Sequence, residues 1–355
     1  MFSMFDINFD SVTKTYQGSR SPAVDDVSFS IKKGQLVSVL GPSGCGKTTI
    51  LRLIAGFERQ ERGEIHLAGK KVSSTGHWVP PEKRNTGMVF QDYALFPHLN
   101  VSQNIGFGYK GRDRARRIDE VIELVRLKGY QKRYPHQLSG GQQQRIALGR
   151  ALARRPVVVL LDEPFSNLDT SMKVAMRDEV REIIKKAGAT AVLVTHDQKD
   201  ALALSDEIIV LKEGRIQQCG EPRKIYQYPQ NKFVADFVGH SNVLAARIGK
   251  DRKTVITSLG SIPCSHTHGL CPGTAVYVSV RPESFELDQK GEIEGVVNKI
   301  TYTGQTIDAA IDAAYNGGKK TGLLVHIHPE KEIGIGQKVR FKVLPDFTAV
   351  IKDRP

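Results

Sequence analysis

Short, continuous apolar runs recur through the first two thirds of the chain, and segments with helical periodicity separate them. Buried strands are expected at residues 35–40, 157–161 and 191–195, of which 157–161 is the longest apolar stretch; a helix is expected from residue 47, and residues 170–186 have helical periodicity. Uninterrupted apolar runs are typical of strands that are buried on both faces. Strands that alternate with helices predict a mostly parallel sheet with helices on both faces. Two short strands are expected at residues 208–211 and 215–218, on either side of Glu213-Gly214, which is a turn signal.

Residues 92–155 depart from this alternation, because they contain several helical segments and no clear strand. We therefore expect an inserted helical subdomain there. After about residue 239, short strand-like runs are separated by Gly, Pro or Asp; examples are residues 275–280, 323–328 and 339–343. These features predict an α/β domain over residues 1–238 and a smaller, all-β domain over residues 239–355.

The composition narrows the class of protein. The chain has 355 residues, of which 40% are hydrophobic and 25% charged, which is ordinary for a soluble protein of two domains. No apolar run approaches the ~18 residues of a membrane span, and we expect no signal peptide. The four cysteines are scattered, which fits a reducing cytosol better than a disulfide framework.

The chain is basic, with a net charge of +13. Such a charge favours anionic partners, including phosphates, lipid head groups and nucleic acid, without choosing among them. The densest basic segment, residues 110–117, is interpreted as a solvent-exposed helix start.

A glycine-rich segment follows the first apolar run and opens the first expected helix; it reads Gly41-Pro42-Ser43-Gly44-Cys45-Gly46-Lys47-Thr48. This spacing predicts a phosphate-binding loop, because glycines let backbone N–H groups turn toward phosphate oxygens and the helix N-terminus adds donors. Lys47 is expected to contact the β- and γ-phosphates, and the Thr48 hydroxyl to ligate Mg²⁺. Cys45 stands where a helix N-terminus can lower a thiol pKa, although a small filler residue is the simpler interpretation.

Two acids, Asp162 and Glu163, end the apolar run at residues 157–161. Asp162 suits a second contact to Mg²⁺, and Glu163 is placed to act as the base, or the orienter, for an attacking water. The pair is therefore predicted to form the second half of a phosphoryl-transfer site.

The segment Leu138-Ser139-Gly140-Gly141-Gln142-Gln143-Gln144-Arg145 resembles the signature motif of ABC ATPases. Ser139 and Gly141 offer a hydroxyl and a backbone donor at a helix start, which is a second phosphate clamp. The resemblance implies that two chains pair head to tail, so that each signature closes on the other chain's ATP. The implied fold is a P-loop NTPase of the ABC type with a helical subdomain, followed by an all-β, oligonucleotide-binding-like domain.

Other family landmarks follow in order. Tyr16 resembles the aromatic residue that stacks on adenine, Gln91 the glutamine that senses the γ-phosphate, and His196 the switch histidine. Asp169, in Ser166-Asn167-Leu168-Asp169, resembles the acid that crosses the dimer interface. The implied catalytic residues are Glu163, His196 and Gln91, and the implied Mg²⁺ contacts are Thr48, Gln91 and Asp162. The implied ATP-binding residues are Tyr16, Gly41, Pro42, Ser43, Gly44, Cys45, Gly46, Lys47, Thr48, Thr49, Ser139, Gly141, Gln142 and Asp169.

The subclass is argued from features that the chain lacks: membrane spans, a long coiled coil and a second ATPase unit. What remains is an importer subunit, peripheral on the cytoplasmic face of the inner membrane. The β-rich tail with Arg281-Pro282-Glu283 resembles the regulatory domain of the maltose, polyamine, sulfate and ferric-iron importer subfamily. The implied partners are a second copy, a two-copy or fused integral membrane permease and, indirectly, a substrate-binding protein. No nucleic acid is expected, although an ABC ATPase acting on nucleic acid or ribosomes is the alternative outside transport.

Tyr93, Leu95 and Phe96 follow Gln91, and the resemblance implies that a permease helix docks near them; the alternative is that they are core residues. Residues 133–137 and 165–169 most resemble ferric-iron importers, which suggests that cargo. Polyamine, phosphonate, sulfate and sugar importers are the alternatives.

The segment 264–271 holds two cysteines and two histidines: Cys264, His266, His268 and Cys271. If residues 264–268 are extended, alternate side chains share a face, which makes a metal site conceivable. His326 and His328 lie further along the chain. A solvated loop is the competing interpretation.

Overall fold

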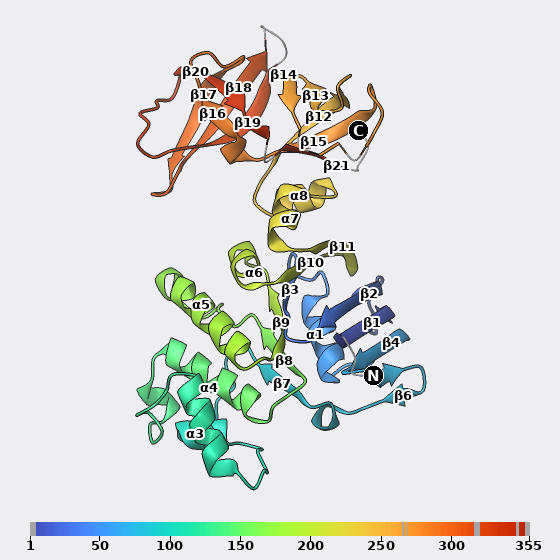
Figure 1. Ribbon diagram of the computed structural model, residues 1–355, viewed down its shortest axis with the longest axis vertical. Coiled ribbons are helices and arrows are strands. Elements are labelled where there is room, and N and C mark those ends of the chain that lie inside the picture. The colour runs from blue at the N-terminus through green and yellow to red at the C-terminus, as the bar shows by residue number, and fades with distance from the viewer. Residues whose placement is uncertain (1–4, 265, 268, 316–319, 346–347, 352–355) are drawn as a thin grey trace. The chain divides into compact units, whose positions relative to one another are not determined.

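The computed structural model describes residues 5–264, 266–267, 269–315, 320–345 and 348–351, and divides the chain into two compact units (Figure 1). The first unit ends at Pro222 and the second begins at Arg223. The division falls after the first residue of helix α7 (Pro222–Gln227), and helix α8 (Lys232–Phe237) lies between it and the domain boundary predicted after residue 238. That boundary stays a prediction. No helix among the described residues is long and apolar enough to cross a membrane.

The first unit is built on a six-stranded sheet in the order β11-β10-β3-β9-β8-β7. Its strands are β3 (Leu36–Leu40), β7 (Thr86–Val89), β8 (Val158–Asp162), β9 (Thr190–Thr195), β10 (Glu207–Lys212) and β11 (Arg215–Gly220). The five strands from β10 to β7 are parallel, and β11 pairs with β10 in the antiparallel sense. The mostly parallel sheet is thus confirmed. Glu213 and Gly214, both with positive φ (49° and 76°), make the expected turn.

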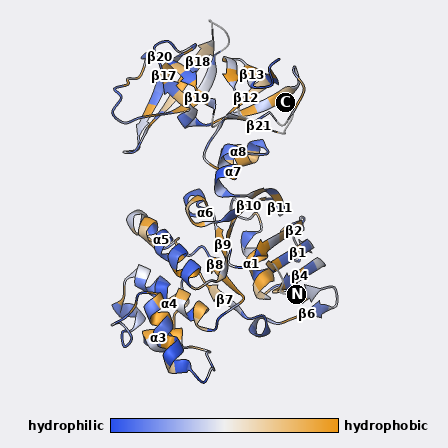
Figure 2. Cartoon of the chain, viewed as in Figure 1, coloured by the Kyte–Doolittle hydropathy of each residue, from blue (hydrophilic) through white to orange (hydrophobic). Residues whose placement is uncertain are grey.

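The two faces of this sheet pack against different layers, because successive strand residues point to opposite sides. Val158 and Leu160 join the core beneath α1 (Lys47–Ala55), whereas Val159 and Leu161 join the core beneath α4 (Gly140–Ala153) and α5 (Thr170–Lys186). Helices therefore cover both faces, as predicted. Figure 2 shows mainly hydrophobic residues along β8 and β9, and a mixture of both kinds along α3 and α5.

A second, antiparallel sheet shares the α1 side, in the order β2-β1-β4-β5-β6, and the sequence patterns did not predict it. Its strands are β1 (Phe5–Lys14), β2 (Val24–Lys32), β4 (Arg62–Leu67), β5 (Lys70–Ser74) and β6 (His77–Trp78), followed by the 3₁₀ turn η1 (Pro81–Lys83).

Residues 92–155, all of which the structure describes, contain helices and no strand, as the expected helical subdomain requires; its bounds stay a prediction. The elements are α2 (Val101–Ile105), α3 (Arg114–Leu124), the 3₁₀ turn η2 (Pro135–Gln137) and α4. Helix α6 (Gln198–Leu204) then links β9 to β10.

The second unit contains α7, α8 and two antiparallel five-stranded sheets, β14-β13-β12-β15-β21 and β16-β20-β17-β18-β19. The first sheet comprises β12 (Asn242–Ile248), β13 (Thr254–Thr257), β14 (Gly260–Pro263), β15 (Ala275–Val280) and β21 (Thr348–Ile351). The second comprises β16 (Phe285–Leu287), β17 (Ile293–Tyr302), β18 (Ile307–Tyr315), β19 (Thr321–Ile327) and β20 (Lys338–Val343), with η3 (Pro282–Ser284) before it. The β-rich C-terminal part is therefore confirmed.

Arg281 ties the two short helices of this unit to its sheets. It is 1% exposed, and it donates from Nε to Tyr226 O (3.0 Å) and from Nη1 to Ala235 O (2.8 Å). Glu283 accepts a hydrogen bond from the Tyr226 hydroxyl at 2.6 Å. The Arg281-Pro282-Glu283 motif is thus an anchor for α7 and α8.

The Cys/His segment gives no support to the metal hypothesis. Among the described residues, no group of three or more His, Cys, Asp or Glu side chains is arranged to hold a metal ion; His268 lies outside them. The buried Cys264 thiol donates to the carbonyl oxygen of His266, whose ring packs 5.5 Å from that of Tyr228. Burial raises the pKa of Cys264, which disfavours the thiolate that a metal would need.

Candidate active site

The predicted site residues converge because four parallel strands end at one edge of the central sheet (Figure 1). In register, Leu40 on β3 pairs with Thr195 on β9, Asp162 on β8 pairs with Val194 on β9, and Val89 on β7 pairs with Leu161 on β8. The loops that follow begin within a residue or two of this row. They bring the phosphate loop, Glu163, His196 and Gln91 to the same edge, which is where ligands bind in open α/β sheets.

The phosphate loop depends on glycines that no other residue replaces without strain. Gly46 has a φ of 106°, and a Cβ there would lie 2.1 Å from Ala23 O. A Cβ on Gly41 would lie 2.3 Å from Leu211 O. No side chain among the described residues caps the N-terminus of α1, so its backbone N–H groups face the loop as free donors.

Lys47 folds back over the loop that precedes it. Its Nζ atom donates to Gly41 O and Pro42 O, each at 2.8 Å, and the side chain is buried. The ammonium is thus held against carbonyl oxygens of the phosphate loop, so an anion bound by the loop would meet it there.

Cys45 is a packed residue of the loop, 4% exposed, with Sγ 3.9 Å from Lys47 Nζ. Burial raises its thiol pKa, and the nearby ammonium only partly offsets that effect. The structure therefore gives no support to a lowered pKa at this helix start, and the simpler interpretation as small filler fits it.

Asp162 and Glu163 place two carboxylates side by side at the end of β8. Burial, and next the charge of Glu163, raise the pKa of Asp162, whereas Arg52 and Lys47 act in the opposite direction. Glu163 adopts a φ of 44°, unusual for a non-glycine residue, and its N–H donates to Val194 O at 2.9 Å. Strain of this kind, of order 1–3 kcal/mol, is typical of functional sites.

His196 reaches Glu163 from the neighbouring strand, with Nδ1 3.0 Å from Oε1. A network that sequence reasoning missed holds this loop. Arg177 on α5 donates from Nε to Asp200 at 2.6 Å, and Asp200 accepts from the Thr195 hydroxyl at 3.1 Å. Because the network ends one residue before His196, it restrains the backbone from which the imidazole extends. The only signal in the sequence was a set of charged residues on amphipathic helices.

Gln91 is exposed just after β7, and its backbone carbonyl oxygen accepts a hydrogen bond from Asn167 Nδ2 at 2.9 Å. Asp169 caps α5 by accepting from Met172 N at 2.9 Å; a hydrogen bond from Ser171, and then that from Met172, lower its pKa. Tyr16 lies beside α1, with its hydroxyl 3.4 Å from Thr49 Oγ1. These contacts bring Tyr16 and Gln91 to the loops of the shared edge.

The signature residues lie over the other face of the sheet. Ser139 is the N-cap of α4 and forms a reciprocal capping box with Gln142, accepting from its backbone N–H at 3.4 Å. Gly141 faces α5, because a Cβ there would lie 3.0 Å from Met176 Sδ. Ser139, Gly141 and Gln142 are therefore grouped near α5, which Asp169 caps, and not with Lys47. Within one chain the two phosphate clamps are separate.

The residues at the shared edge fit a magnesium nucleotide. The loop offers backbone donors and the Lys47 ammonium to phosphates, and the raised pKa of Asp162 marks a buried carboxylate whose charge Arg52 and Lys47 compensate only in part. A divalent cation would supply it. Few protein carboxylates are needed, since Mg²⁺ in such sites is bound mainly by phosphates and water.

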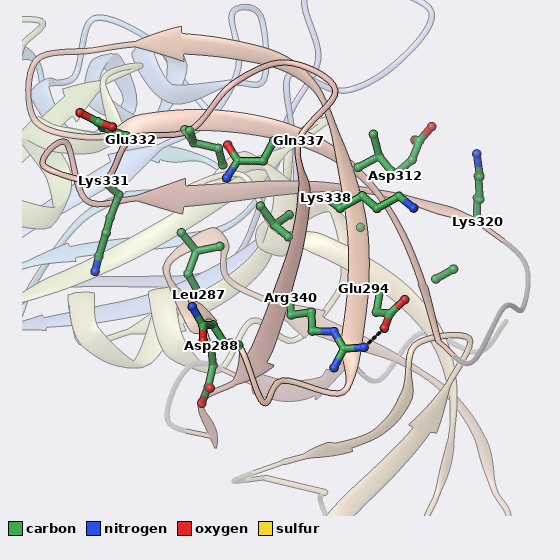
Figure 3. Close-up of a pocket in the computed structure, with 16 residues that line it drawn as sticks. Leu287, Asp288, Glu294, Asp312, Lys320, Lys331, Glu332, Gln337, Lys338 and Arg340 are labelled. Carbon is green, nitrogen blue, oxygen red and sulfur yellow. Dashed lines mark hydrogen bonds and ion pairs between the residues drawn. The ribbon is translucent and has the colours of Figure 1, made fainter.

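A separate cavity of about 750 Å³ lies on the second unit, lined by β16, β17, β18, β20 and the loop before β20 (Figure 3). Asp312 and Lys338 flank Val296 on one face of the sheet, and Glu294 pairs with Arg340 beside them. None of the predicted site residues lines this cavity.

Comparisons with known proteins agree with this geometry. Residues 24–166 match the ABC transporter family. The chain is 41% identical over 324 residues to the Fe(3+) ions import ATP-binding protein FbpC of Fusobacterium nucleatum, covering 89% of this chain and 82% of that protein. It is 40% identical over 339 residues to the spermidine/putrescine import ATP-binding protein PotA of Rubrobacter xylanophilus, covering 92% and 87%.

Among solved structures, the chain is similar to the dimeric, post-hydrolysis state of the ATP-binding cassette MJ0796 bound to ADP and Pi. The TM-score is 0.52 and the identity 32%, and the match covers 61% of this chain and 98% of that one. The chain therefore belongs to the ABC transporter family, as one of its ATP-hydrolysing, ATP-binding subunits.

Proposed function

We propose that this chain is the motor subunit of an ABC importer, that two copies pair head to tail, and that the dimer works on the cytoplasmic face of a membrane. One observation carries the proposal. The phosphate loop, Glu163 and His196 share one edge of the sheet, whereas the Ser139 clamp is capped on a helix that covers the opposite face from α1. A second copy brings the missing clamp. That the solved cassette MJ0796 is dimeric supports this pairing.

In the proposed reaction Lys47 and the free N–H groups of α1 bind the β- and γ-phosphates of ATP. Glu163 orients the attacking water and accepts its proton at a carboxylate oxygen, and His196 keeps that carboxylate in place through Nδ1. Thr48, Gln91 and Asp162 would hold Mg²⁺, which when bound neutralises phosphate charge. Closure of the second copy over this edge would exclude water and strengthen these contacts.

The proposed permease-docking surface follows Gln91. Tyr93 is a core residue, 5% exposed, so the core interpretation holds for it. Arg150 binds the carbonyl oxygens of Tyr93 (2.9 Å) and Ala94 (2.6 Å), and Asn104 binds both the N–H and the carbonyl of Phe96. These clamps, which the sequence did not reveal, make a rigid segment between Gln91 and the surface.

Phe96 is half-buried on that segment, and its ring packs 4.2 Å from that of Phe107, which is 51% exposed. The two rings suit the apolar face of a permease helix. Since Gln91 begins the same segment, a change at the γ-phosphate would reach the docked helix through it.

For the cargo we favour ferric iron, which the relative from Fusobacterium nucleatum is named for importing. The relative from Rubrobacter xylanophilus is named for spermidine and putrescine, so polyamines are the second candidate. The motor site itself does not contact cargo.

Reconstitution tests the function directly. The chain would be combined in lipid nanodiscs with its co-encoded permease, and ATPase activity measured with the loaded binding protein and a panel of ferric iron, polyamine, sulfate, phosphonate and sugar. We expect stimulation by one cargo only. Stimulation by RNA, DNA or ribosomes, with none by any loaded binding protein, would reject the importer assignment.

A further inference from the structure

The positive charge of the chain is concentrated in the helical subdomain. Residues 92–155 contain thirteen basic and five acidic residues, a surplus of eight, out of the net +13 of the whole chain. The remaining residues are close to balanced. A local surplus of this size points to an anionic partner for this subdomain.

The exposed cations gather where the start of α3 meets the end of α4. Arg117 on α3 donates from Nε to Ala153 O (3.1 Å) and from Nη2 to Leu152 O (2.9 Å), which fixes the two segments side by side. We name this surface the basic corner. Its exposed members are Lys110, Arg112, Arg114, Arg116, Arg154 and Arg155.

Two acids beside these cations, Asp113 and Glu120, are already engaged, and Asp119 on α3 is exposed. Asp113 accepts from the Tyr109 hydroxyl at 2.7 Å, and Glu120 lies within 3.8 Å of Arg155 and within 3.5 Å of Arg116. In the described part of the chain, no acidic side chain forms an ion pair with Lys110, Arg112 or Arg154. These three charges are available to a partner.

The position of the arginines opposes helix stability. Helix α3 begins at Arg114, its first turn holds no acid, and Asp113 makes no side-chain cap. Cations at a helix N-terminus interact unfavourably with the helix dipole, where anions would be favourable. The arginines make local hydrogen bonds and ion pairs, but their charges at this helix start are unfavourable, and a bound anion would offset that cost.

An exposed aromatic ring adjoins the cations. Phe107 is 51% exposed, and Arg114 donates to Gly106 O, the preceding carbonyl, at 3.1 Å. Basic side chains around an exposed aromatic residue are typical of surfaces that lie on a lipid interface. A nucleic-acid surface would offer a groove with several stacking rings.

We propose that the basic corner binds the anionic phospholipid headgroups of the membrane that holds the permease. The inference rests on the proposed function, because Phe107 packs on Phe96 of the permease-docking surface, and the corner then faces the membrane beside the permease. Contact with lipid would hold the motor subunit at the membrane between docking events.

The test is cosedimentation of the full-length protein with vesicles of pure phosphatidylcholine and with vesicles containing phosphatidylglycerol. The variant Lys110→Gln/Arg112→Gln/Arg154→Gln removes the three unpaired charges. Because each basic residue near an anionic surface contributes about a fivefold factor, the triple variant should bind the anionic vesicles roughly a hundredfold more weakly. Higher salt concentrations should likewise weaken binding of the wild-type protein to the anionic vesicles.

The matched control, Lys33→Gln/Lys70→Gln/Lys83→Gln, removes three exposed charges elsewhere on the first unit and should bind as the wild-type protein does. Equal binding of both triple variants, or equal binding of the wild-type protein to neutral vesicles, overturns the proposal. Tighter binding of the wild-type protein to RNA or DNA than to anionic vesicles, at equal phosphate concentration, also overturns the proposal. Vesicle binding needs no permease, so it is read independently of the importer assignment, which fails or survives on the reconstitution result.

Discussion

Nδ1 of His196 lies 3.0 Å from Oε1 of Glu163, and this contact joins the ends of β9 and β8. The register of the sheet sets it, since Asp162 pairs with Val194 just before the two side chains leave their strands. A carboxylate in this position, next to the phosphate loop, can orient a water, and the imidazole restricts where that carboxylate points. The proposed hydrolysis depends on this contact.

Replacing the base should separate binding from turnover. In Glu163→Gln the amide keeps the shape of the side chain but cannot accept a proton, so ATP should still bind while phosphate release falls by about 10²–10⁴-fold. Binding of a fluorescent nucleotide and steady-state phosphate release measure the two effects. Glu123→Gln, an exposed acid on α3, is the control and should retain full turnover. Turnover within twofold of wild type in Glu163→Gln would remove Glu163 from the mechanism.

The network behind His196 predicts a pH dependence of stability. Burial, and next the charge of Asp197, raise the pKa of Asp200 above its usual 3.8. The folded state then binds more protons than the unfolded chain between the two values, so the free energy of unfolding should fall as the pH rises through that window. Denaturant titrations across this range should show a smaller fall in Asp200→Asn, while exposed Asp178→Asn behaves as wild type. Identical slopes in all three proteins would contradict the assignment.

The phosphate loop should not tolerate a side chain at Gly46. In Gly46→Ala the new Cβ would meet Ala23 O at 2.1 Å and the φ of 106° would be strained, so we expect a loss of more than about 2 kcal/mol of stability together with nucleotide affinity. Chemical denaturation and nucleotide titration report the two losses. Gly18→Ala, with a φ of 82° and nothing within 4 Å, should cost only about 1 kcal/mol and leave affinity unchanged. Equal costs at the two positions would show that the close approach is unimportant.

Arg281 should be a strong anchor of the second unit. Arg281→Met leaves the carbonyl groups of Tyr226 and Ala235 buried without their donor, which should cost about 2–3 kcal/mol. Arg340→Met removes an exposed ion pair with Glu294 and should cost less than about 1 kcal/mol. Circular dichroism follows unfolding of both units, while the single tryptophan, Trp78, reports on the first unit, so a loss seen by the first probe alone belongs to the second unit. A cost for Arg281→Met no greater than that of the control would refute the anchoring role.

Parts of the fold were predictable because their physics is local. Parallel strands that are buried on both faces consist mainly of apolar residues. Strands β8 (residues 158–162) and β9 (residues 190–195) begin and end within one residue of the predicted segments. Helix α5 spans the predicted residues 170–186. The antiparallel sheet was missed, because β1 pairs with β4 some 50 residues away and no tight turn announces the pairing. The overlooked signals were a weak alternation of polar and apolar residues and the two-residue turn at Ala68-Gly69, which joins β4 to β5.

The candidate site, too, was predictable only in part. The spacing of glycines, Lys47 and the strand-end acids predicted which side chains meet, since parallel strands share an edge. The residues that hold them were missed: Arg177 and Asp200 behind His196, and Asn104 and Arg150 behind the docking segment. Sequence patterns predict that a charged residue on an amphipathic helix faces solvent, and only the tertiary structure shows that it is buried. No local pattern therefore distinguishes these supporting residues from surface charges.

The central claim, that each active site is completed by a second copy, is tested by mixing two inactive variants. Lys47→Ala disables the phosphate loop and Ser139→Arg disables the opposing clamp, so dimers of either variant should hydrolyse almost no ATP. A mixed dimer contains one site with both halves intact, and equal mixtures should recover about a quarter of the wild-type sites. Recovered phosphate release well above that of either variant alone is the predicted result. A mixture no more active than its parts would contradict the shared site.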